Sequence, residues 1–418
     1  MLATPKGFRI HIGLFGRRNV GKSSLLNALT RQSVSIVSDV AGTTTDPVEK
    51  PMELLPLGPV LFIDTAGIDD VGALGDLRMH KTRAVFDRTD VGVIVTDATW
   101  GAFEDGLRDE LARRGVPTVV VFNKTDLARP DPETERRLAE AGVTTVATDA
   151  AHGTGILDFR QALVDQVPAE LINQPAILGD LVGPGALAVL VVPIDKEAPK
   201  GRLILPQVQA IRDLLDHDAG CLVVKEHQLR DAIAQLAVPP RLVVTDSQAF
   251  DKVADDTPAN VPLTSFSILF ARFKGDLVTQ TLGALAIDTL KPGDRVLVAE
   301  SCSHHPIEDD IGRVKLPAWL RRHVGGELAF TTVQGHDFPE DLSDYKLVIH
   351  CGACMWNRRE MLTRVLRCGR ANVPITNYGL AIAYSLGIFE RALGPFPAAL
   401  EAYRAAKSSG ASEHARLA

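Results

Sequence analysis

Short apolar runs along this chain alternate with segments in which apolar residues recur at helical spacing. Runs of this length are typical of buried strands, and their alternation with helices indicates parallel sheets. Strands are predicted at residues 8–15, 61–63, 119–122, 186–193, 221–224, 241–245, 296–299 and 347–349. Helices are predicted at 24–29, 158–167, 207–215, 228–236, 277–289, 318–323 and 380–386, with another that begins at Asn357. The predicted fold class is therefore α/β.

The length of the chain and the breaks in this pattern predict three domains. A chain of 418 residues is too long for a single hydrophobic core. Residues 168–185, rich in proline and glycine, interrupt the periodicity and are typical of a linker. We predict domains at 1–170, 180–262 and 263–400, followed by a flexible tail at 401–418.

The middle domain is predicted to be a small parallel α/β module. Its strands and helices alternate regularly, and no catalytic constellation appears in its sequence. By elimination we interpret it as a dimerisation module. Its apolar first strand, at 186–193, could pair with the same strand of a second copy.

The first predicted strand runs into a phosphate-binding loop, Gly-Arg-Arg-Asn-Val-Gly-Lys-Ser, and a helix follows. In this pattern backbone N–H groups surround the phosphates, the lysine reaches the β and γ oxygens, and the serine hydroxyl binds Mg²⁺. Lys22 is therefore a candidate catalytic residue as well as a nucleotide ligand. The candidate nucleotide ligands of this loop are Gly16, Gly21, Lys22, Ser23 and Ser24.

Two further segments have the properties of nucleotide switches. Asp64 ends a strand and begins Asp-Thr-Ala-Gly, so its carboxylate can hold the Mg²⁺ shell and the Gly67 amide can sense the γ-phosphate. Residues 42–47 lie where a switch loop belongs. A threonine hydroxyl there can complete the metal shell only while the γ-phosphate is present.

A base-recognition motif follows another buried strand. Asn123, Lys124 and Asp126 belong to Asn-Lys-Thr-Asp, whose carboxylate suits the N1 and exocyclic amine donors of guanine. The Ser-Ala pair expected to contact the base is replaced by Asp149 and Ala150. We therefore expect GTP or GDP rather than an adenine nucleotide, bound by a Ras-like P-loop GTPase domain.

The order and spelling of these motifs resemble the GTPases of the TrmE and Era group. The resemblance implies that Asn19 helps to bind K⁺, as in the potassium-activated members, and that Thr44 is the threonine that binds Mg²⁺. Ile68 stands where Ras-like proteins carry their water-positioning glutamine, so intrinsic hydrolysis should be slow unless K⁺ or another residue contributes. Asp76 is a candidate for that role, and a solvated loop charge is the alternative reading.

Three cysteines of the third domain follow apolar runs. Cys302 follows one run, and Cys351 and Cys354 follow the next, just ahead of a helix. Because ligands collect beyond the carboxyl ends of parallel strands, and a helix N-terminus favours negative charge, we expect these thiols to meet. The remaining cysteines, Cys221 and Cys368, have no partner at useful spacing and are interpreted as structural.

Three thiols leave several kinds of site open. One is an iron–sulfur cluster with one exchangeable ligand, and another is a Cys₃His zinc site. Three buried apolar thiols without a metal are the remaining alternative. The histidines available for a zinc site are His304, His305 and His350. The acidic residues Glu308, Asp309 and Asp310, which follow Cys302 in the sequence, could also supply an oxygen ligand.

Four motifs of the third domain are highly specific in combination. They read Cys-Ser-His-His-Pro, Glu-Asp-Asp-Ile-Gly-Arg-Val-Lys, Ile-His-Cys-Gly-Ala-Cys and Pro-Ile-Thr-Asn-Tyr-Gly. After a TrmE/Era-like GTPase domain and a small α/β module, they resemble the HydF family of [FeFe]-hydrogenase maturation GTPases. The resemblance extends over the chain to about residue 395.

The resemblance to this family implies a scaffold or carrier with a third α/β domain that binds a [4Fe–4S] cluster. Cys302, Cys351 and Cys354 would be its ligands, and the labile fourth ligand would be His304 or Asp309, with Glu308 behind them. It also implies a transient diiron subcluster, built with two radical-SAM maturases and delivered to apo-[FeFe]-hydrogenase. The family is expected to form a homodimer through the middle module, or a tetramer.

Composition narrows the alternatives. The net charge of −7 and an aromatic content of 5% argue against a nucleic-acid partner. No apolar run reaches the length of a membrane span, and the first residues do not resemble a signal peptide, so we expect a cytoplasmic protein without a membrane partner. Two rival functions remain: a tRNA- or ribosome-associated GTPase with a structural Cys₃His zinc site, and a redox enzyme that exchanges disulfides at Cys351 and Cys354.

Overall fold

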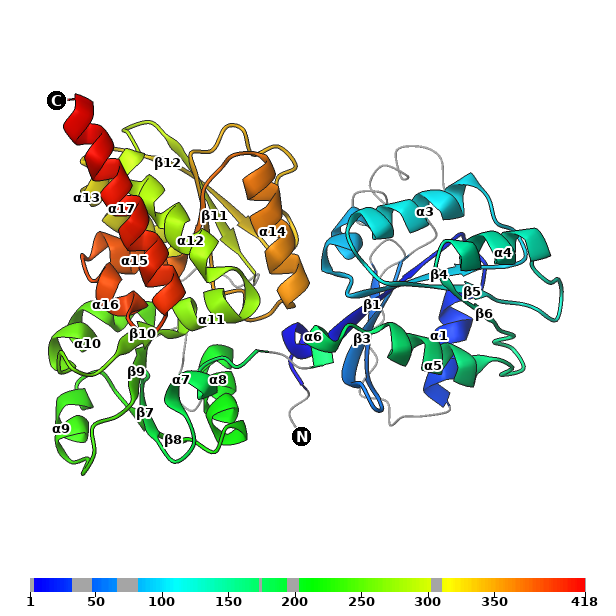
Figure 1. The fold of residues 1–418 in the computed structure, drawn as a ribbon, viewed down its shortest axis with the longest axis horizontal. Coiled ribbons are helices and arrows are strands. Elements are labelled where there is room, and N and C mark those ends of the chain that lie inside the picture. Colours follow the sequence, from blue (N-terminus) through cyan, green and yellow to red (C-terminus); the bar gives the residue numbers. More distant parts are fainter. Residues whose placement is uncertain are drawn as a thin grey trace. The chain divides into compact units, whose positions relative to one another are not determined.

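The computed structural model describes residues 4–31, 47–65, 82–172, 175–193, 203–301 and 310–417. The chain divides into two compact units, Met1–Gln174 and Pro175–Ala418 (Figure 1). Each unit consists of helices packed on largely parallel sheets, which confirms the predicted α/β class. No helix in the described ranges is both long and apolar enough to cross a membrane.

The first unit is built on a six-stranded sheet of order β2-β3-β1-β4-β5-β6. Its pairs are parallel except for β2 and β3, which run antiparallel. The strands are β1 (Ile10–Phe15), β2 (Val48–Leu54), β3 (Gly58–Asp64), β4 (Val91–Thr96), β5 (Thr118–Phe122) and β6 (Thr144–Ala147). The helices include η1 (Lys6–Phe8), α1 (Lys22–Arg31), α3 (Ala102–Arg113), α4 (Pro132–Glu140), α5 (Ile156–Gln166) and α6 (Ala169–Ile172).

Helices cover both faces of this sheet. Every residue of β1 and β4 is buried, because these central strands carry apolar side chains toward both faces. One apolar cluster joins Leu14 and Val93 to α1 and α5, and the other joins Phe15 and Ile94 to α3 and α4. These two pairs of helices lie on opposite sides of the sheet (Figure 1). The loops at the carboxyl ends of the central strands are therefore held by two cores.

The second unit contains two parallel four-stranded sheets, of orders β10-β9-β7-β8 and β12-β11-β13-β14. The first sheet consists of β7 (Leu187–Val191), β8 (Gly220–Val224), β9 (Leu242–Thr245) and β10 (Leu263–Ser265). The second consists of β11 (Arg295–Glu300), β12 (Ala329–Gln334), β13 (Leu347–His350) and β14 (Ile375–Asn377).

The helices of the second unit fill the spaces around these sheets. In the second sheet α14 packs on one face, and α13 and α15 pack on the other. The α-helices are α7 (Gly179–Val182), α8 (Leu205–Asp216), α9 (Leu229–Ala234), α10 (Phe250–Asp256), α11 (Phe266–Lys274), α12 (Leu277–Ala284), α13 (Leu316–Val324), α14 (Arg358–Arg370), α15 (Tyr378–Ser385), α16 (Phe389–Leu393) and α17 (Pro397–Leu417). Shorter helical segments are η2 (Ser247–Ala249), η3 (Leu285–Thr289) and η4 (Ile311–Lys315).

One expectation about this unit is wrong. The strand predicted at 186–193 was expected to be free to pair with a second copy, but β7 lies between β8 and β9 and is paired on both sides. The segment predicted as a tail overlaps α17, and its Tyr403 is buried in edge-to-face contact with Phe389, 4.9 Å between ring centroids. An aromatic side chain that packs in this way gives the helix a tertiary anchor.

Arginine side chains join elements that are distant in the sequence. Arg391 of α16 donates hydrogen bonds to the carbonyl oxygens of Ala254 (2.6 Å), Thr257 (2.5 Å) and Pro258 (3.2 Å) at the end of α10. Arg358, the first residue of α14, donates to the carbonyl oxygen of Phe273, 2.6 Å away, at the end of α11. Terminal helix carbonyls lack partners within their own helix, so these guanidinium groups satisfy them.

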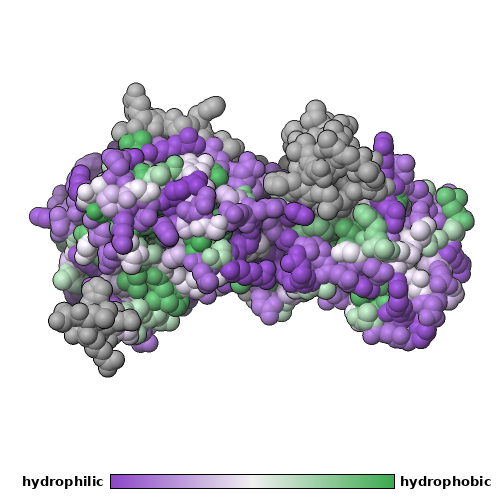
Figure 2. All heavy atoms as spheres, turned by 90° about the horizontal axis from the view of Figure 1, so that it is seen from above, coloured by the Kyte–Doolittle hydropathy of each residue, from purple (hydrophilic) through white to green (hydrophobic). Residues whose placement is uncertain are grey.

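The surface on view is mainly hydrophilic, with smaller apolar patches between hydrophilic residues (Figure 2). This agrees with the 23% of charged residues in the sequence. Other exposed apolar side chains lie on both units, for example Leu127, Leu157 and Leu366. Such isolated residues are common on protein surfaces and need no partner to explain them.

Gly283 brings α12 into direct contact with β14, and this contact can be tested. A Cβ atom at Gly283 would lie 2.0 Å from the carbonyl oxygen of Ile375, whereas one at Gly369 of α14 would meet nothing within 4 Å. Gly283→Ala should therefore destabilise the second unit by about 1–3 kcal/mol, because backbone must move apart. Gly369→Ala is the matched control and should be neutral or stabilise by about 0.5–1 kcal/mol. Urea unfolding followed by circular dichroism measures the stability of both variants. Equal midpoints for the two variants would contradict the packing described.

Candidate functional site

The phosphate-binding loop joins β1 to α1 in the predicted arrangement. A Cβ atom at Gly16 would lie 2.1 Å from the carbonyl oxygen of Val95, and Gly16 has a φ of 144°. Only glycine fits there without strain. The Lys22 ammonium donates hydrogen bonds to the carbonyl oxygens of Gly16 (2.9 Å) and Arg17 (2.7 Å), so it lies across the loop. Ser24 is exposed at the start of α1, and Asn19 is exposed with a φ of 64°.

The two described residues that we expect to bind Mg²⁺ lie together. The hydroxyl of Ser23 donates a hydrogen bond to a carboxylate oxygen of Asp64, 2.6 Å away. Burial raises the pKa of Asp64, although Ser23 and Lys22 oppose the change. A divalent cation between the two oxygens would stabilise the carboxylate in this partly enclosed position.

Asn123 connects the phosphate-binding loop to the loop that should contact the base. Its amide nitrogen donates to the carbonyl oxygen of Val20 (3.0 Å). Its amide oxygen accepts from the Thr148 hydroxyl (3.0 Å) and the Ala150 amide (3.1 Å). Gly21 packs against the same side chain, because a Cβ atom there would lie 2.3 Å from the Asn123 amide nitrogen. These contacts hold three loops in register.

The neighbouring base-site residues project from this framework. Lys124 adopts a left-handed backbone conformation, with a φ of 58°. Asp126 follows two residues later and is exposed, as a side chain that accepts hydrogen bonds from a base must be. Ala150 lies in the facing loop, where its amide is anchored by Asn123.

An ion pair between the phosphate-binding loop and α3 was not predicted from the sequence. Arg17 donates to Glu104 through Nε (2.7 Å) and Nη2 (3.1 Å), and its guanidinium lies 4.8 Å from the ring centroid of Phe103. Glu104 is fully buried and also accepts from the Gly101 amide at the start of α3. The Gly101-to-Glu104 spacing is a capping signal that could have been noticed in the sequence.

Several predicted site residues lie outside the described residues, and their roles stay predictions. In the first domain they are Thr44, Gly67 and Asp76. In the third domain they are Cys302, His304, His305, Glu308 and Asp309.

The ends of β11 and β13 meet at Cys351. The Cys351 amide donates to the carbonyl oxygen of Ala299 (2.9 Å), which extends the pairing of the two strands. The Ser301 amide donates to the sulfur of Cys351 (3.1 Å), and the Ser301 hydroxyl lies 3.3 Å from the same sulfur. Ser301 immediately precedes Cys302 in the sequence.

The loop from Cys351 to α14 is tightly turned. Ala353 has a φ of 52°, and its carbonyl oxygen accepts a hydrogen bond from the Trp356 amide (3.1 Å). Cys354 lies within this turn and is partly buried. Asn357 caps α14 by accepting from the Glu360 amide (3.3 Å). The turn therefore places both cysteines ahead of a capped helix N-terminus.

His350 does not fit the role of a metal ligand. It is buried, its Nδ1 lies 2.8 Å from the carbonyl oxygen of Cys351, and its Nε2 lies 3.2 Å from Nη1 of Arg364. Because arginine can only donate, Nε2 accepts and Nδ1 donates. Burial and the nearby Arg364 charge lower the pKa of His350 to about 3, so the ring is neutral. Because both of its ring nitrogens are used, His350 cannot be the histidine ligand of a Cys₃His zinc site.

Arg364 forms a buried network behind the cysteine loop that the sequence did not reveal. Its guanidinium lies 4.0 Å from the Trp356 ring centroid and 4.6 Å from that of Phe338, and Nη2 donates to the carbonyl oxygen of Gly335 (2.8 Å). Glu360, one turn earlier on α14, lies 3.9 Å from Arg364. This network holds His350 and Trp356, and through them the backbone at Cys351.

The described residues fit an iron–sulfur cluster in their hydrogen bonding. Burial raises the pKa of the Cys351 thiol, while hydrogen bonds from Ser301 and the Ala353 amide lower it less strongly. A bound metal supplies the positive charge that a buried thiolate lacks, and backbone N–H groups directed at sulfur are typical of cluster sites. By contrast, burial raises the pKa of Cys368 to about 12, and this residue of α14 packs in the apolar core between that helix and the sheet, in agreement with a structural role.

Family models match three consecutive parts of the chain. Residues 11–124 match the 50S ribosome-binding GTPase, residues 177–275 the hydrogen maturase F dimerization domain, and residues 277–395 the hydrogen maturase F tetramerization domain. The two hydrogen maturase F models adjoin and together span more than half of the chain. The chain belongs to the hydrogen maturase F (HydF) family. In this HydF protein the first domain is a GTPase domain, and the other two domain types support self-association.

Curated relatives named as GTPases match about a third of the chain. The tRNA modification GTPase MnmE of Synechococcus sp. (strain JA-2-3B'a(2-13)) is 38% identical over 165 residues, which are 37% of this chain and 33% of the relative. GTPase Der of Wolinella succinogenes is 36% identical over 135 residues, 31% of this chain and 28% of the relative. This HydF chain therefore spans about a third or less of the length of these relatives.

Solved structures match part of the chain. The G domain of the T. maritima FeoB iron transporter is 20% identical, with a TM-score of 0.31, over 38% of this chain and 99% of that one. An Era variant of Aquifex aeolicus is 18% identical, with a TM-score of 0.33, over 59% of this chain and 97% of that one. Similarity at this level carries no argument about function.

The Arg17–Glu104 pair should contribute to nucleotide affinity in HydF. Arg17→Ala removes two charge-assisted hydrogen bonds that hold the phosphate-binding loop against α3, so we expect the Kd for GTP to rise roughly fivefold, about 1 kcal/mol. Arg108→Ala, on the outer side of α3, breaks ion pairs to Asp105 and Asp109 and should leave the Kd within about twofold. Fluorescent-nucleotide titrations measure both. Equal affinities for the two variants would rule out this positioning role.

Proposed function

We propose that this HydF protein is a GTP-hydrolysing scaffold for assembly of the [FeFe]-hydrogenase active site. It holds a [4Fe–4S] cluster through Cys302, Cys351 and Cys354 and carries a diiron precursor to apo-hydrogenase. The observation that carries the proposal is the contact of Ser301 with the sulfur of Cys351, inside the region that matches the tetramerization domain. The partners that would load and receive the diiron unit are radical-SAM maturases and apo-[FeFe]-hydrogenase.

The cysteine site supplies three thiolates at most, and this number matters for a carrier. A cluster with three protein thiolates keeps one iron with an exchangeable ligand. Candidates for that ligand are His304 and Asp309, with Glu308 behind them. Since His350 donates to a backbone carbonyl and accepts from Arg364, it orients the loop instead. The diiron cargo can attach where the exchangeable ligand leaves.

The GTPase domain provides the nucleotide-dependent half of this function. Ser23 and Asp64 would hold Mg²⁺, together with Thr44, and Lys22 would reach the β and γ phosphates. Asn19 lies in the phosphate-binding loop, where a K⁺ ion would add positive charge to the transition state. Gly67 and Asp76 keep their predicted roles in sensing the γ-phosphate and positioning water. We also propose that the three domains span residues 1–170, 180–262 and 263–400.

Iron loading tests the cysteine site directly. After anaerobic reconstitution with iron and sulfide, the wild type should contain roughly four irons per chain and show a [4Fe–4S] signal by EPR after reduction. Cys351→Ala should lose the signal, because no other described thiol can replace it. Cys368→Ala is the matched control and should keep the signal, since this thiol lies in an apolar core. Stoichiometric zinc without iron in the wild type would contradict the proposal.

A second candidate function is favoured by the match of residues 11–124 to a ribosome-binding GTPase and by relatives named as tRNA modification GTPases. This function would require a structural zinc site at the cysteines. The zinc outcome of the experiment above is the result that supports it.

Self-association would use the free edge of the first sheet in the second unit. β8 pairs only with β7 among the described strands, and its Val223 side chain is 42% exposed. Apolar side chains on the neighbouring α8, Val208 and Leu215, are exposed as well. An edge strand bordered by apolar residues can pair with the same edge of a second copy.

A charge on this edge should weaken the dimer. Val223→Lys places an ammonium group where β8 would meet its copy, so we expect the dimer Kd to rise at least about tenfold, or 1.4 kcal/mol. Val238→Lys, at an exposed position outside the strands, should leave the dimer intact. Light scattering across a concentration series measures both variants. A dimer of unchanged stability in Val223→Lys would exclude β8 as the interface.

A further inference from the structure

We propose that Asp126, Asp149 and His152 form a binding site for a divalent transition-metal ion, and that this ion and guanine exclude each other. The inference rests on the proposed guanine-nucleotide function, because Asp126 is the residue expected to accept hydrogen bonds from the base. It adds to that function a means by which metal availability controls nucleotide occupancy.

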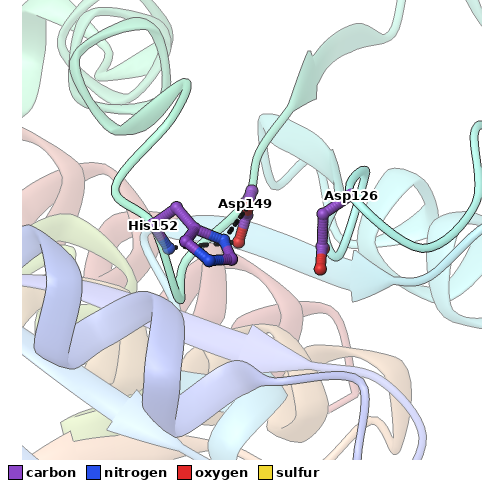
Figure 3. A group of neighbouring side chains, drawn as sticks. All are labelled: Asp126, Asp149 and His152. Carbon is purple, nitrogen blue, oxygen red and sulfur yellow. Dashed lines mark hydrogen bonds and ion pairs between the residues drawn. The ribbon is translucent and has the colours of Figure 1, made fainter.

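Three potential metal ligands come together at the base site. One oxygen of Asp126, one oxygen of Asp149 and one ring nitrogen of His152 all lie within 4.8 Å of one another. The two carboxylates come from different loops, one after β5 and one after β6, and the imidazole lies beside Asp149 (Figure 3). Asp126 and His152 are exposed, so their side chains can turn toward an ion that Asp149 also binds.

Asp149 is held in place before any ligand binds. One of its oxygens accepts hydrogen bonds from the amides of Ala151 (3.0 Å) and His152 (3.2 Å), and the other lies 2.6 Å from Nδ1 of His152. A backbone bridge between Asp149 and Thr154 closes the loop.

The sequence makes an independent argument for a ligand other than the base. A serine is expected at position 149, where this chain has a carboxylate. One carboxylate is sufficient for the two N–H donors on the edge of guanine, so a second one adds negative charge that the base does not need. Two carboxylates and an imidazole are, however, a donor set that divalent transition metals prefer.

The donor set also selects the kind of ion. Imidazole is a good ligand for Zn²⁺, Fe²⁺ or Ni²⁺, whereas Mg²⁺ prefers oxygen ligands and retains its water. Three protein ligands leave a coordination position for water. The Mg²⁺ of the nucleotide would therefore stay at Ser23 and Asp64, and a transition metal would occupy the base site.

Exclusion follows from the chemistry of Asp126. To accept the N1 and amino hydrogen bonds of guanine, both of its oxygens must face the base, whereas metal binding turns one oxygen toward Asp149 and His152. Metal binding and guanine binding therefore compete for one side chain.

Competition can be measured with Zn²⁺ as the probe and a fluorescent GDP analogue, in full-length protein with excess Mg²⁺. At a Zn²⁺ concentration about ten times its own Kd, the apparent Kd for GDP in the wild type should rise about tenfold. In Asp149→Asn and His152→Ala, Zn²⁺ should raise the apparent Kd for GDP by less than about twofold. His227→Ala, which alters a histidine 3.7 Å from Glu226 in the second unit, is the matched control and should behave as the wild type.

The same comparison also accounts for zinc bound at other sites. Zinc bound at the cysteines is common to all four proteins, so it cannot produce a difference between them. An unchanged wild-type Kd, or an equal rise in the wild type and both variants, would overturn the inference and leave Asp149 and His152 as a pair that only braces its loop.

Direct zinc counting separates this inference from the proposed function. In equilibrium dialysis without nucleotide, the wild type should bind one more Zn²⁺ per chain than His152→Ala, and saturating GDP should remove the difference. If GDP does not bind at all, the proposed guanine function fails, while the dialysis still tests the metal site. Equal zinc content in the two nucleotide-free proteins would contradict the metal site itself.

Discussion

Parallel strand pairing is the constraint on which both candidate sites depend. In a parallel sheet the carboxyl ends of neighbouring strands lie at one edge, so residues far apart in the sequence become neighbours there. In the GTPase domain, this edge brings together the loops after β1, β3, β5 and β6. In the second unit it brings Ser301, after β11, to Cys351, after β13. The same geometry therefore builds a phosphate and base site in one domain and a thiol site in another.

Buried polar side chains then set the details of these edges. Asn123 uses both ends of its amide to connect three loops of the nucleotide site. Arg364 has an equivalent position behind the cysteine loop, where it contacts His350 and the Trp356 ring. Both groups are buried, and a buried polar group is tolerated only when its hydrogen bonds are satisfied. Each therefore resists movement of the loops around it, which is the rigidity that a precise ligand site requires.

Some elements carried no signal that the sequence alone could supply. The edge strand β12 mixes apolar and polar residues, and none of them is fully buried, so it lacks the apolar run that identifies a central strand. The sequence also does not show the order of the strands within a sheet. The apolar run at β7 looked available for pairing with a second copy, yet β8 and β9 occupy both of its edges. Hydrophobicity reports that a strand is buried, but not which neighbours bury it.

The sequence by itself determined the α/β class, the phosphate-binding loop, the base motif and the segments that carry Cys351 and Cys354. These follow from local patterns, because glycine positions, apolar runs and the spacing of polar residues act within a few residues of each other. Only the tertiary structure decided that both ring nitrogens of His350 bond to Arg364 and a backbone carbonyl. It also decided that Arg17 pairs with Glu104, and that His152 contacts Asp149 close to Asp126. Those contacts join side chains across loops or turns, and their formation depends on packing that no local pattern encodes.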